Sequence, residues 1–547
     1  MALALSINSA VAAAEPGVSL FDAAERMGFT VPSSCRRQGK CRECLIEVAA
    51  GMEWLTPRAP EESHLRGNYR LACRCAVAAA GGEVKCHLLG RALLQIETGA
   101  INLAPGSGAD RPDPAVTRDG DTIFLDGARI ATGAGPIHGV AIDVGTTTVV
   151  ARAINLETGA VVATASFENP QRFGGSDVMA RIQYDTEHPG GILRRTLAGY
   201  LTRAIESLPL DTGSIYEYAV AGNPTMRDLL FGLDVRSIGQ RPYWSLTQRE
   251  FREGRRPGTS LLAGARSLGL PGHPRARVYG LPLIGGHVGS DAAACLLAIR
   301  PHLGERRVAI MDIGTNTELV IGNRHRLLAA SCPAGPAFEG GAISCGMPGL
   351  AGAIARVAIG DDGAVACQVI GGESPQGICG SGLIDLLSEL LRTGRMNAFG
   401  RLENGDEAFV VDAAAGISLR ESDINELAQA KGANVAGLRI VAQRYGIALE
   451  DINVFYLAGG FGRHIDVDAA RRIGLIPDLP SGRIVPVGNT SIEGASIALL
   501  SVSRRRELEA LVATIGHVEL ETDPGFFDQF VAGCQFRPIA SGREAPA

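Results

Sequence analysis

One short pattern occurs twice in this chain, and it constrains the fold more than any other feature. A run of apolar residues ending in Asp143 is followed by Val-Gly-Thr-Thr-Thr, and a second run ending in Asp312 is followed by Ile-Gly-Thr-Asn-Thr-Glu. Each copy is typical of a β-strand that ends at an acidic residue and turns at a glycine. Two copies separated by the length of a domain indicate a duplicated fold with a ligand between its halves.

The remaining sequence predicts an α/β fold behind a smaller α+β domain. From residue 138 onward, β-branched runs alternate with longer helical segments. Before it, short strand-like runs surround one helix-like segment, and a stretch rich in Gly, Pro and Asp follows, with a hairpin turn expected at Asp126-Gly127. In chain order we predict an N-terminal domain at 1–90, a linker with a short hairpin at 91–137, a two-lobed domain at 138–535 with lobes at roughly 138–305 and 306–535, and a tail at 536–547.

Composition and charge argue against two classes of function. The net charge is −6, aromatic residues make up only 5%, and no basic stripe is present, so we expect no nucleic-acid surface. The apolar stretch 281–299 carries His287, Asp291 and several glycines, so it does not predict a membrane helix. The apolar start lacks a basic segment, which disfavours a signal peptide. We therefore expect a cytoplasmic protein.

Six of the 12 cysteines lie in the first 90 residues, and four of them have the spacing of a metal site. Cys35 and Cys41 are separated by five residues, Cys41 and Cys44 by two, and Cys73 follows after 28 more. Three thiolates on one loop can surround two irons while a fourth arrives from a distant strand. Zinc usually takes two CxxC pairs, and only one is present. The spacing favours a [2Fe–2S] cluster, with zinc and structural cysteines as the alternatives.

This region resembles the plant-type and adrenodoxin-type ferredoxins. The resemblance runs from Glu15-Pro-Gly-Val-Ser through the cysteine loop to Tyr69-Arg-Leu-Ala-Cys73. Because the last ligand of that family follows an Arg-Leu-x-Cys pattern, the resemblance implies Cys73 as the fourth ligand. Cys75 is the alternative, since a shift of two residues keeps the same face of a strand. The implied cluster ligands are Cys35, Cys41, Cys44 and Cys73.

The cysteine loop departs from those ferredoxins in its charge. Where they place small glycines, this loop holds three arginines, a glutamine and a lysine, and only Gly39 retains the glycine chemistry. One interpretation is a solvated charged loop, and the other is a docking patch for an acidic partner. Positive charge beside the cluster should also raise its reduction potential. The residues concerned are Arg36, Arg37, Gln38, Lys40 and Arg42.

The two Asp-x-Gly patterns look like the phosphate motifs of the actin, heat-shock chaperone and sugar-kinase superfamily. A third string, Leu457-Ala-Gly-Gly-Phe-Gly, resembles its adenosine motif. The resemblance implies an actin-like ATPase fold that binds ATP. Asp143 and Asp312 would hold Mg²⁺ through water or orient the attacking water. The implied nucleotide residues are Gly145, Thr146, Thr147, Gly314, Thr315, Asn316, Thr317, Gly459, Gly460 and Gly462.

Five further strings are not shared with ordinary sugar kinases. Together with the cysteine loop they resemble the reductive activators of corrinoid-dependent methyltransferases, over nearly the whole chain. The resemblance implies a β-grasp ferredoxin-type domain in front of the two-lobed ATPase. The strings are Asn169 to Ile182, Gly222 to Met226, Pro333 to Gly340, Gly377 to Asp385, and Gly488 to Ala495.

The resemblance implies a repair reaction in which ATP drives one electron from the cluster to an inactive Co(II) corrinoid, restoring Co(I). The partners would be a corrinoid protein and a donor that reduces the cluster, and a homodimer is one assembly that it allows. Three other functions stay open at this point. They are a ferredoxin-fused small-molecule kinase, an ATP-gated redox sensor, and an activator of a radical dehydratase, although the last would need a cysteine pair for a [4Fe–4S] cluster inside the ATPase domain.

Overall fold

The computed structural model describes residues 2–539 except 9, 30, 34, 90–92, 96–111, 406 and 461. Parts of the expected linker (96–111) and tail (540–547) therefore lie outside the described residues. The chain forms two compact units. Unit 1 comprises Met1–Glu253, Ser260–Leu281 and Ala498–Ser503, and unit 2 comprises Gly254–Thr259, Pro282–Ile497 and Arg504–Ala547.

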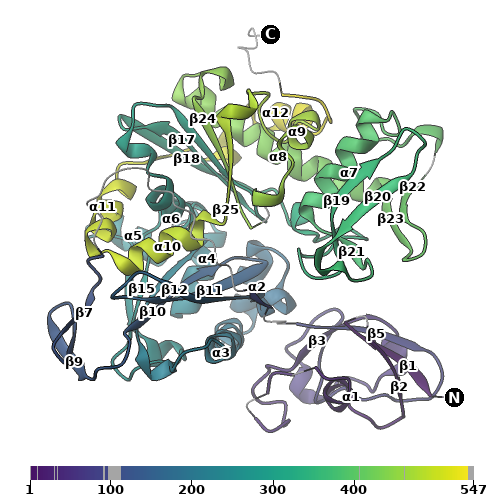
Figure 1. Ribbon diagram of the computed structural model, residues 1–547, viewed down its shortest axis with the longest axis horizontal. Coiled ribbons are helices and arrows are strands. Elements are labelled where there is room, and N and C mark those ends of the chain that lie inside the picture. The colour runs from purple at the N-terminus through teal and green to yellow at the C-terminus, as the bar shows by residue number, and fades with distance from the viewer. Residues whose placement is uncertain are drawn as a thin grey trace. The chain divides into compact units, whose positions relative to one another are not determined.

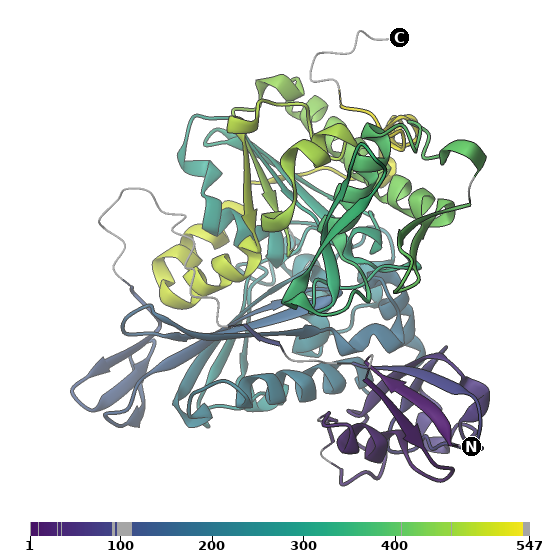
Figure 2. The ribbon, with the colours of Figure 1, turned by 45° about the vertical axis from the view of Figure 1, so that its right-hand side comes forward.

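Unit 1 begins with a small five-stranded sheet in the order β2-β1-β5-β3-β4, drawn in purple in Figures 1 and 2. Strand β1 alternates buried and exposed residues and runs parallel to β5, so one face of the sheet forms a core of Leu3, Leu5 and Ile7. Ser19 caps the helix that packs on this core by accepting a hydrogen bond from the amide of Asp22. The elements are β1 (Leu3–Ile7), β2 (Ala10–Ala14), α1 (Leu20–Arg26), β3 (Leu45–Ala50), β4 (Tyr69–Leu71) and β5 (Glu83–Leu88).

The second sheet of unit 1 has seven strands in the order β14-β15-β13-β10-β11-β12-β6. Every residue of β10 is buried, as expected for a central strand that is covered on both faces. It pairs antiparallel with β11 and parallel with β13. The strands are β6 (Leu93–Gln95), β10 (His138–Val144), β11 (Thr148–Asn155), β12 (Val161–Glu168), β13 (Ile215–Gly222), β14 (Leu261–Gly264) and β15 (Arg277–Gly280), and the helices are α2 (Val178–Glu187), α3 (Ile192–Glu206), α4 (Pro224–Phe231) and α5 (Leu246–Arg252).

A separate three-stranded sheet of unit 1 is formed by β7 (Val116–Asp119), β8 (Thr122–Leu125) and β9 (Ala128–Thr132). Strands β8 and β9 pair antiparallel around Asp126 and Gly127. Both turn residues have positive φ angles, which suits a tight two-residue hairpin.

Unit 2 contains a six-stranded sheet in the order β25-β24-β16-β17-β18-β26. Strand β16 pairs antiparallel with β17 and parallel with β24, so its place matches that of β10 in unit 1. The strands are β16 (Val308–Asp312), β17 (Thr317–Asn323), β18 (Arg326–Cys332), β24 (Val454–Ala458), β25 (Ile484–Gly488) and β26 (Gly516–His517).

The principal helices of unit 2 lie along the sequence between and after these strands, and two smaller sheets accompany them. Helix α8 is long and largely buried in its second half. The helices are α6 (Ser290–Ile299), α7 (Gly380–Arg392), α8 (Glu421–Tyr445), α9 (Val467–Arg472), α10 (Thr490–Leu500, whose last residues belong to unit 1), α11 (Val502–Val512) and α12 (Phe526–Gly533), and the small sheets are β20-β19-β21 (Val365–Val369, Ala353–Ile359, Gly377–Ile378) and β22-β23 (Ala408–Asp412, Ile417–Arg420).

The two larger sheets confirm the predicted duplication. In each, three antiparallel strands in sequence are extended by parallel strands that arrive later in the chain, giving the orders β12-β11-β10-β13-β15 and β18-β17-β16-β24-β25. The α/β class follows from the parallel strands and the helices that connect them. Among the described helices, none has both the length and the apolar sequence that crossing a membrane requires.

Candidate functional sites

The four predicted cluster cysteines lie together in the ferredoxin-type part of unit 1, as two pairs. The Sγ atoms of Cys44 and Cys73 are 3.3 Å apart, and the side chain of Cys41 hydrogen-bonds that of Cys35. Within the described residues, no three or more His, Cys, Asp or Glu side chains are already arranged for a single metal ion. Two neighbouring thiol pairs suit a centre with two irons, each of which takes two thiolates.

Backbone amides of the loop point at these sulfur atoms. Burial raises the pKa of Cys35, but hydrogen bonds from the amides of Cys41, Lys40 and Gln38 outweigh it and lower the pKa to about 7. The hydrogen bond with Cys44, together with the amide of Gly39, lowers the pKa of Cys73. The same hydrogen bond, together with burial, raises the pKa of Cys44. Because a cluster binds thiolates, amides that stabilise negative sulfur at Cys35 and Cys73 fit such a group.

The arginines of the loop adopt the backbone conformation that glycine usually supplies. Arg36, Arg37 and Arg42 have φ angles of 51°, 66° and 61°, and Gly39 has 72°. This left-handed region is costly for residues with a side chain. Arg37 forms ion pairs with Asp22 and Glu25 of α1, so its positive charge is paired within the domain. Glycine is therefore not required for the amides to face the sulfur atoms.

Cys75, the alternative fourth ligand, lies in a different environment. Its side chain is fully buried in the hydrophobic core, as is that of Cys86. Burial raises the pKa of each of these two thiols to about 12. Cys44 is equally buried, so burial alone does not separate the two candidates, and it is the contact of the Cys73 sulfur atom with Cys44 that favours Cys73.

In unit 1 the predicted phosphate residues form a tight turn between β10 and β11. Asp143 is buried near the end of β10, and the amide of Gly145 donates to the carbonyl of Thr148 at 3.0 Å. A Cβ atom at Gly145 would come within 2.5 Å of that carbonyl oxygen, so the turn leaves no room for a side chain there. The turn thus presents Thr146 and Thr147 in a fixed backbone conformation.

Two side chains outside the predicted site hold the carbonyl groups of this turn. Asn169 donates from Nδ2 to the carbonyl of Gly145 at 2.8 Å and from its backbone amide to that of Thr147 at 2.7 Å. Arg181, which is fully buried on α2, donates from Nη2 to the carbonyl of Thr146 at 2.7 Å. Three successive carbonyls are therefore fixed by two residues. Both belong to the first of the five strings quoted above, to which the sequence assigned no role.

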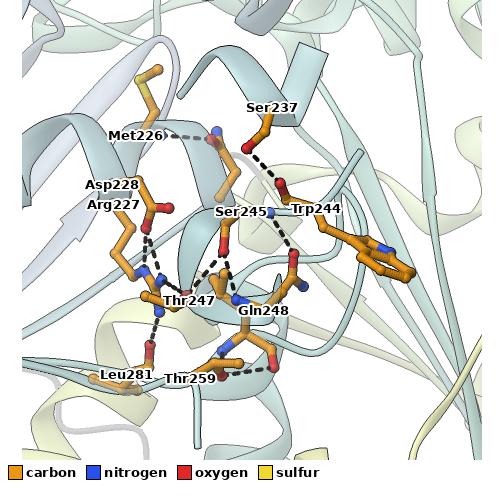
Figure 3. Close-up of polar contacts among 12 residues, drawn as sticks. Met226, Arg227, Asp228, Ser237, Trp244, Ser245, Thr247, Gln248, Thr259 and Leu281 are labelled. Atoms are coloured by element: carbon orange, nitrogen blue, oxygen red, sulfur yellow. Dashed lines mark hydrogen bonds and ion pairs between the residues drawn. The ribbon is translucent and has the colours of Figure 1, made fainter. Parts of the chain in front are cut away.

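The hydroxyl of Thr146 is held by a third such residue. Asn223 donates from Nδ2 to Thr146 Oγ1 at 3.0 Å, and its Oδ1 caps α4 by accepting from the amide of Met226. A buried network fixes this helix, as Figure 3 shows. In it Arg227 pairs with Asp228, both fully buried, and donates to the carbonyl of Leu281 at 2.9 Å. The position of Asn223 is thus determined by the packing of α4.

In unit 2 the second phosphate turn packs directly on the adenosine motif. The amide of Ile313 donates to the carbonyl of Ala458 at 3.1 Å. Gly459 has a φ of 112°, and a Cβ atom there would lie 2.3 Å from the carbonyl oxygen of Ile313. Only glycine permits this approach. The other predicted residues follow in the same two turns: Gly314, Thr315, Asn316 and Thr317 after Asp312, and Gly460 and Gly462 after Gly459.

The surroundings of this second turn are acidic. The thiol of Cys295 donates to Asp312 Oδ2 at 3.2 Å, and Thr490 donates to Cys295 Sγ at 2.9 Å. Burial, together with the charges of Asp291 and Asp312, raises the pKa of Glu318 well above its usual range. Carboxylates at this density attract a cation, and oxygen ligands are those that Mg²⁺ prefers.

A further carboxylate reaches the turn from another of the quoted strings. The hydroxyl of Thr315 donates to Glu339. The structure therefore brings Asp143 to Thr147 together in unit 1, and Asp312 to Thr317 together with Gly459 to Gly462 in unit 2. Thr490 belongs to the last of the quoted strings, to which the sequence assigned no role, and Cys295 was not singled out by the sequence. The contacts of Thr490 with Cys295 and of Cys295 with Asp312 depend on the packing of α6 and α10 beside β16.

Comparison with known families matches three segments of the chain. Residues 7–78 match a 2Fe-2S iron-sulfur cluster binding domain, residues 138–303 the RACo middle region, and residues 307–541 the C-terminal domain of RACo, described as the ASKHA domain. The three matches follow one another along the chain in the order of the predicted domains. The match confirms the predicted combination of a [2Fe–2S] ferredoxin-type domain with an actin-like ATPase domain.

Similar proteins cover most or nearly all of the chain. The corrinoid activation enzyme RamQ of Eubacterium limosum is 28% identical over 579 aligned residues, covering 94% of this chain and 95% of the relative. A [Co(II) methylated amine-specific corrinoid protein] reductase of Methanosarcina barkeri is 27% identical, covering 71% and 75%. A solved reductive activator for corrinoid, iron-sulfur protein has a TM-score of 0.72 at 27% identity and covers 98% of both chains. These matches confirm the resemblance drawn from the motifs.

Proposed function

We propose that this protein reduces the inactive Co(II) form of a corrinoid protein to Co(I), passing one electron from its [2Fe–2S] cluster at the expense of ATP. The observation that carries the proposal is the RACo domain set behind a ferredoxin-type domain in one chain. The names of the relatives agree, since they describe corrinoid activation and Co(II) corrinoid reduction.

Cys35, Cys41, Cys44 and Cys73 hold the cluster in this proposal. Two observations support this set over one that includes Cys75. The Sγ atoms of Cys44 and Cys73 are 3.3 Å apart, and backbone amides face Cys35 and Cys73. Of the charged loop residues, Arg36, Arg37 and Lys40 are exposed, and Arg37 is paired with Asp22 and Glu25, which leaves Arg36 and Lys40. They are the ones available to an acidic surface of the electron donor or of the corrinoid protein.

ATP binds to the turns that follow Asp143 and Asp312, with its adenosine part against Gly459, Gly460 and Gly462. The turn of unit 1 offers a rigid backbone, and the acidic turn of unit 2 supports Mg²⁺ held by Asp312 through water. Asp143 either holds the same Mg²⁺ through water or orients the attacking water.

The need for ATP follows from the redox chemistry. A plant-type cluster has a potential of about −400 mV, and each ~100 mV of uphill one-electron transfer costs about 2.3 kcal/mol. When bound, the cluster supplies single electrons and ATP supplies the free energy that a more reducing Co(I) product requires. The chain itself converts that free energy through differential binding in two conformations. We place this activity in the cytoplasm, with a separate donor for the cluster and with a homodimer as the assembly to be tested.

The deciding experiment is anaerobic. The reduced protein is mixed with a Co(II) corrinoid methyltransferase subunit, and the visible spectrum is followed for Co(I) with and without ATP. We expect Co(I) only when ATP is present. Cys41→Ala should abolish electron transfer and leave nucleotide binding intact, whereas Cys86→Ala, a control in β5 of the same domain, should keep the cluster spectrum and the reaction.

Other outcomes would contradict the proposal. ADP formation that depends on a small-molecule acceptor and survives Cys41→Ala would favour the kinase. Nucleotide binding without any Co(I), across several corrinoid subunits and with an intact cluster, would favour the sensor.

A further inference from the structure

The ferredoxin-type domain contacts α2 of unit 1 through a buried segment around His64. The hydroxyl of Tyr184 on α2 donates to the carbonyl of His64 at 2.6 Å. The ring of His64 lies edge-on to that of Phe173 at 6.1 Å between centroids, and Phe173 lies edge-on to Tyr184 at 5.4 Å. His64 is only 4% exposed, so this is a packed contact.

A second contact lies beside the cluster itself. Glu43 immediately precedes the predicted ligand Cys44, and its carbonyl accepts a hydrogen bond from the hydroxyl of Tyr200 on α3 at 2.6 Å. Arg203, one turn later on α3, pairs with the Glu43 carboxylate at 2.7 Å. The cluster loop is thus attached to the same helical layer.

The residues that receive His64 belong to the elements that hold the phosphate turn. Arg181 and Tyr184 are three residues apart on α2 and so lie on the same side of the helix. One donates to the carbonyl of Thr146 and the other to that of His64. Likewise, Asn169 caps the short 3₁₀ helix Pro170–Gly174 that carries Phe173, and Asn169 holds the carbonyls on either side of Thr146. Two independent elements therefore connect the turn to the ferredoxin-type domain.

We propose that α2 and the 3₁₀ helix Pro170–Gly174 transmit nucleotide occupancy at the Thr146 turn to the docking of the ferredoxin-type domain, with Arg181 and Tyr184 as positioning residues. A phosphate group bound by the amides and hydroxyls of the turn further stabilises the conformation in which its carbonyls accept hydrogen bonds from Asn169 and Arg181. Through these two residues it favours the geometry in which Phe173 and Tyr184 receive His64. This inference rests on the proposed function, because it requires ATP to bind the turn of unit 1.

Hydrogen–deuterium exchange on the cluster-loaded, full-length protein tests it, with and without the non-hydrolysable analogue AMPPNP and Mg²⁺. In the unaltered protein we expect the analogue to slow exchange in two segments, 143–148 and 61–68. Tyr184→Phe removes the hydroxyl that reaches His64. It should keep the protection of 143–148, and the analogue-dependent protection of 61–68 should fall about threefold to tenfold, the range expected for one lost hydrogen bond.

Tyr218→Phe is the matched control. Tyr218 is also a buried tyrosine of unit 1 that donates to a backbone carbonyl, but its acceptor is Pro271 rather than a residue of the ferredoxin-type domain. It should leave the protection of both segments unchanged. Should Tyr184→Phe fold poorly, Glu187→Gln replaces it. This change removes the ion pair of α2 with Arg66 and should weaken the protection of 61–68 about twofold.

The outcomes separate this inference from the proposed function. Protection of 143–148 without any change at 61–68 overturns the coupling and leaves nucleotide binding intact. Full protection of 61–68 in Tyr184→Phe also overturns it. A lack of response in both segments counts against the nucleotide site itself, and with it against both proposals.

Discussion

The turns after Asp143 and Asp312 occupy the same place in the same topology, yet they differ in what surrounds them. The first has its carbonyls fixed by a side-chain amide, a backbone amide and the buried guanidinium of Arg181. The second lies among carboxylates, with Asp312 bonded by Cys295 and Glu318 buried nearby.

The two turns therefore share a backbone topology and differ in the side chains around them. A turn whose carbonyls are all fixed recognises a ligand by geometry, through amides and hydroxyls that need not move. A turn among carboxylates recognises a cation by charge. We therefore expect equivalent substitutions in the two turns to have different effects on ATP hydrolysis and on stability.

Replacing Asp143 or Asp312 with asparagine should have the largest effect, which is on the rate of ATP hydrolysis. Asp312→Asn should lower the rate of ATP hydrolysis about 100-fold or more, because it removes charge where Mg²⁺ and the developing phosphate charge need it. Asp143→Asn should lower it less. The measurement is steady-state ATPase activity over a range of Mg²⁺ concentrations, with the cluster spectrum as the check that unit 1 is folded. A larger loss in Asp143→Asn would reverse the assignment of the two turns.

Adding a methyl group to each glycine of the turns should have a moderate and unequal effect. Gly145→Ala places Cβ 2.5 Å from the carbonyl oxygen of Thr148, whereas Gly314→Ala places it 3.2 Å from that of Asn316. We expect Gly145→Ala to destabilise its turn by about 1–3 kcal/mol, as overpacking does, and Gly314→Ala by less than about 1 kcal/mol. Local hydrogen exchange of β10 and β16 measures the two costs. Equal costs would show that the first turn is no more rigid than the second.

The smallest effect concerns the pH dependence of unit 2. Because the folded pKa of Glu318 is raised, the folded state keeps a proton that the unfolded state releases above a pH of about 4.5. The stability contributed by this group is complete below that pH and falls as pH rises toward the folded pKa, by at most about 1.4 kcal/mol per pH unit. Glu318→Gln should remove this component.

Urea unfolding followed between pH 5 and 8 by a probe in β17 measures the slope. Glu217→Gln serves as the contrast in unit 1, where the carboxylate pairs with Arg277 and its loss should destabilise at every pH in this range. An unchanged slope in Glu318→Gln would show that its proton does not contribute to folding.

Much of the fold was predictable because its signals are local. The two Asp-x-Gly strand ends, the alternation of strands and helices, and the cysteine spacing can each be read within a few residues, and the sheets place them as expected. The chemical role of the site residues stays a prediction. The glycine pattern of the cluster loop was a poorer guide, because arginines adopt the same backbone conformation.

The sequence by itself determined the strand-and-turn repeat, the set of cysteines and the order of the motifs along the chain. These features depend on periodicity and spacing over short stretches of sequence. Only the tertiary structure decided which side chains hold each turn. The Tyr184 bond to His64 spans 120 residues and the Thr490 bond to Cys295 spans 195, so neither has a local signal. Such contacts arise when whole elements pack, and the packing gave two similar turns opposite electrostatic surroundings.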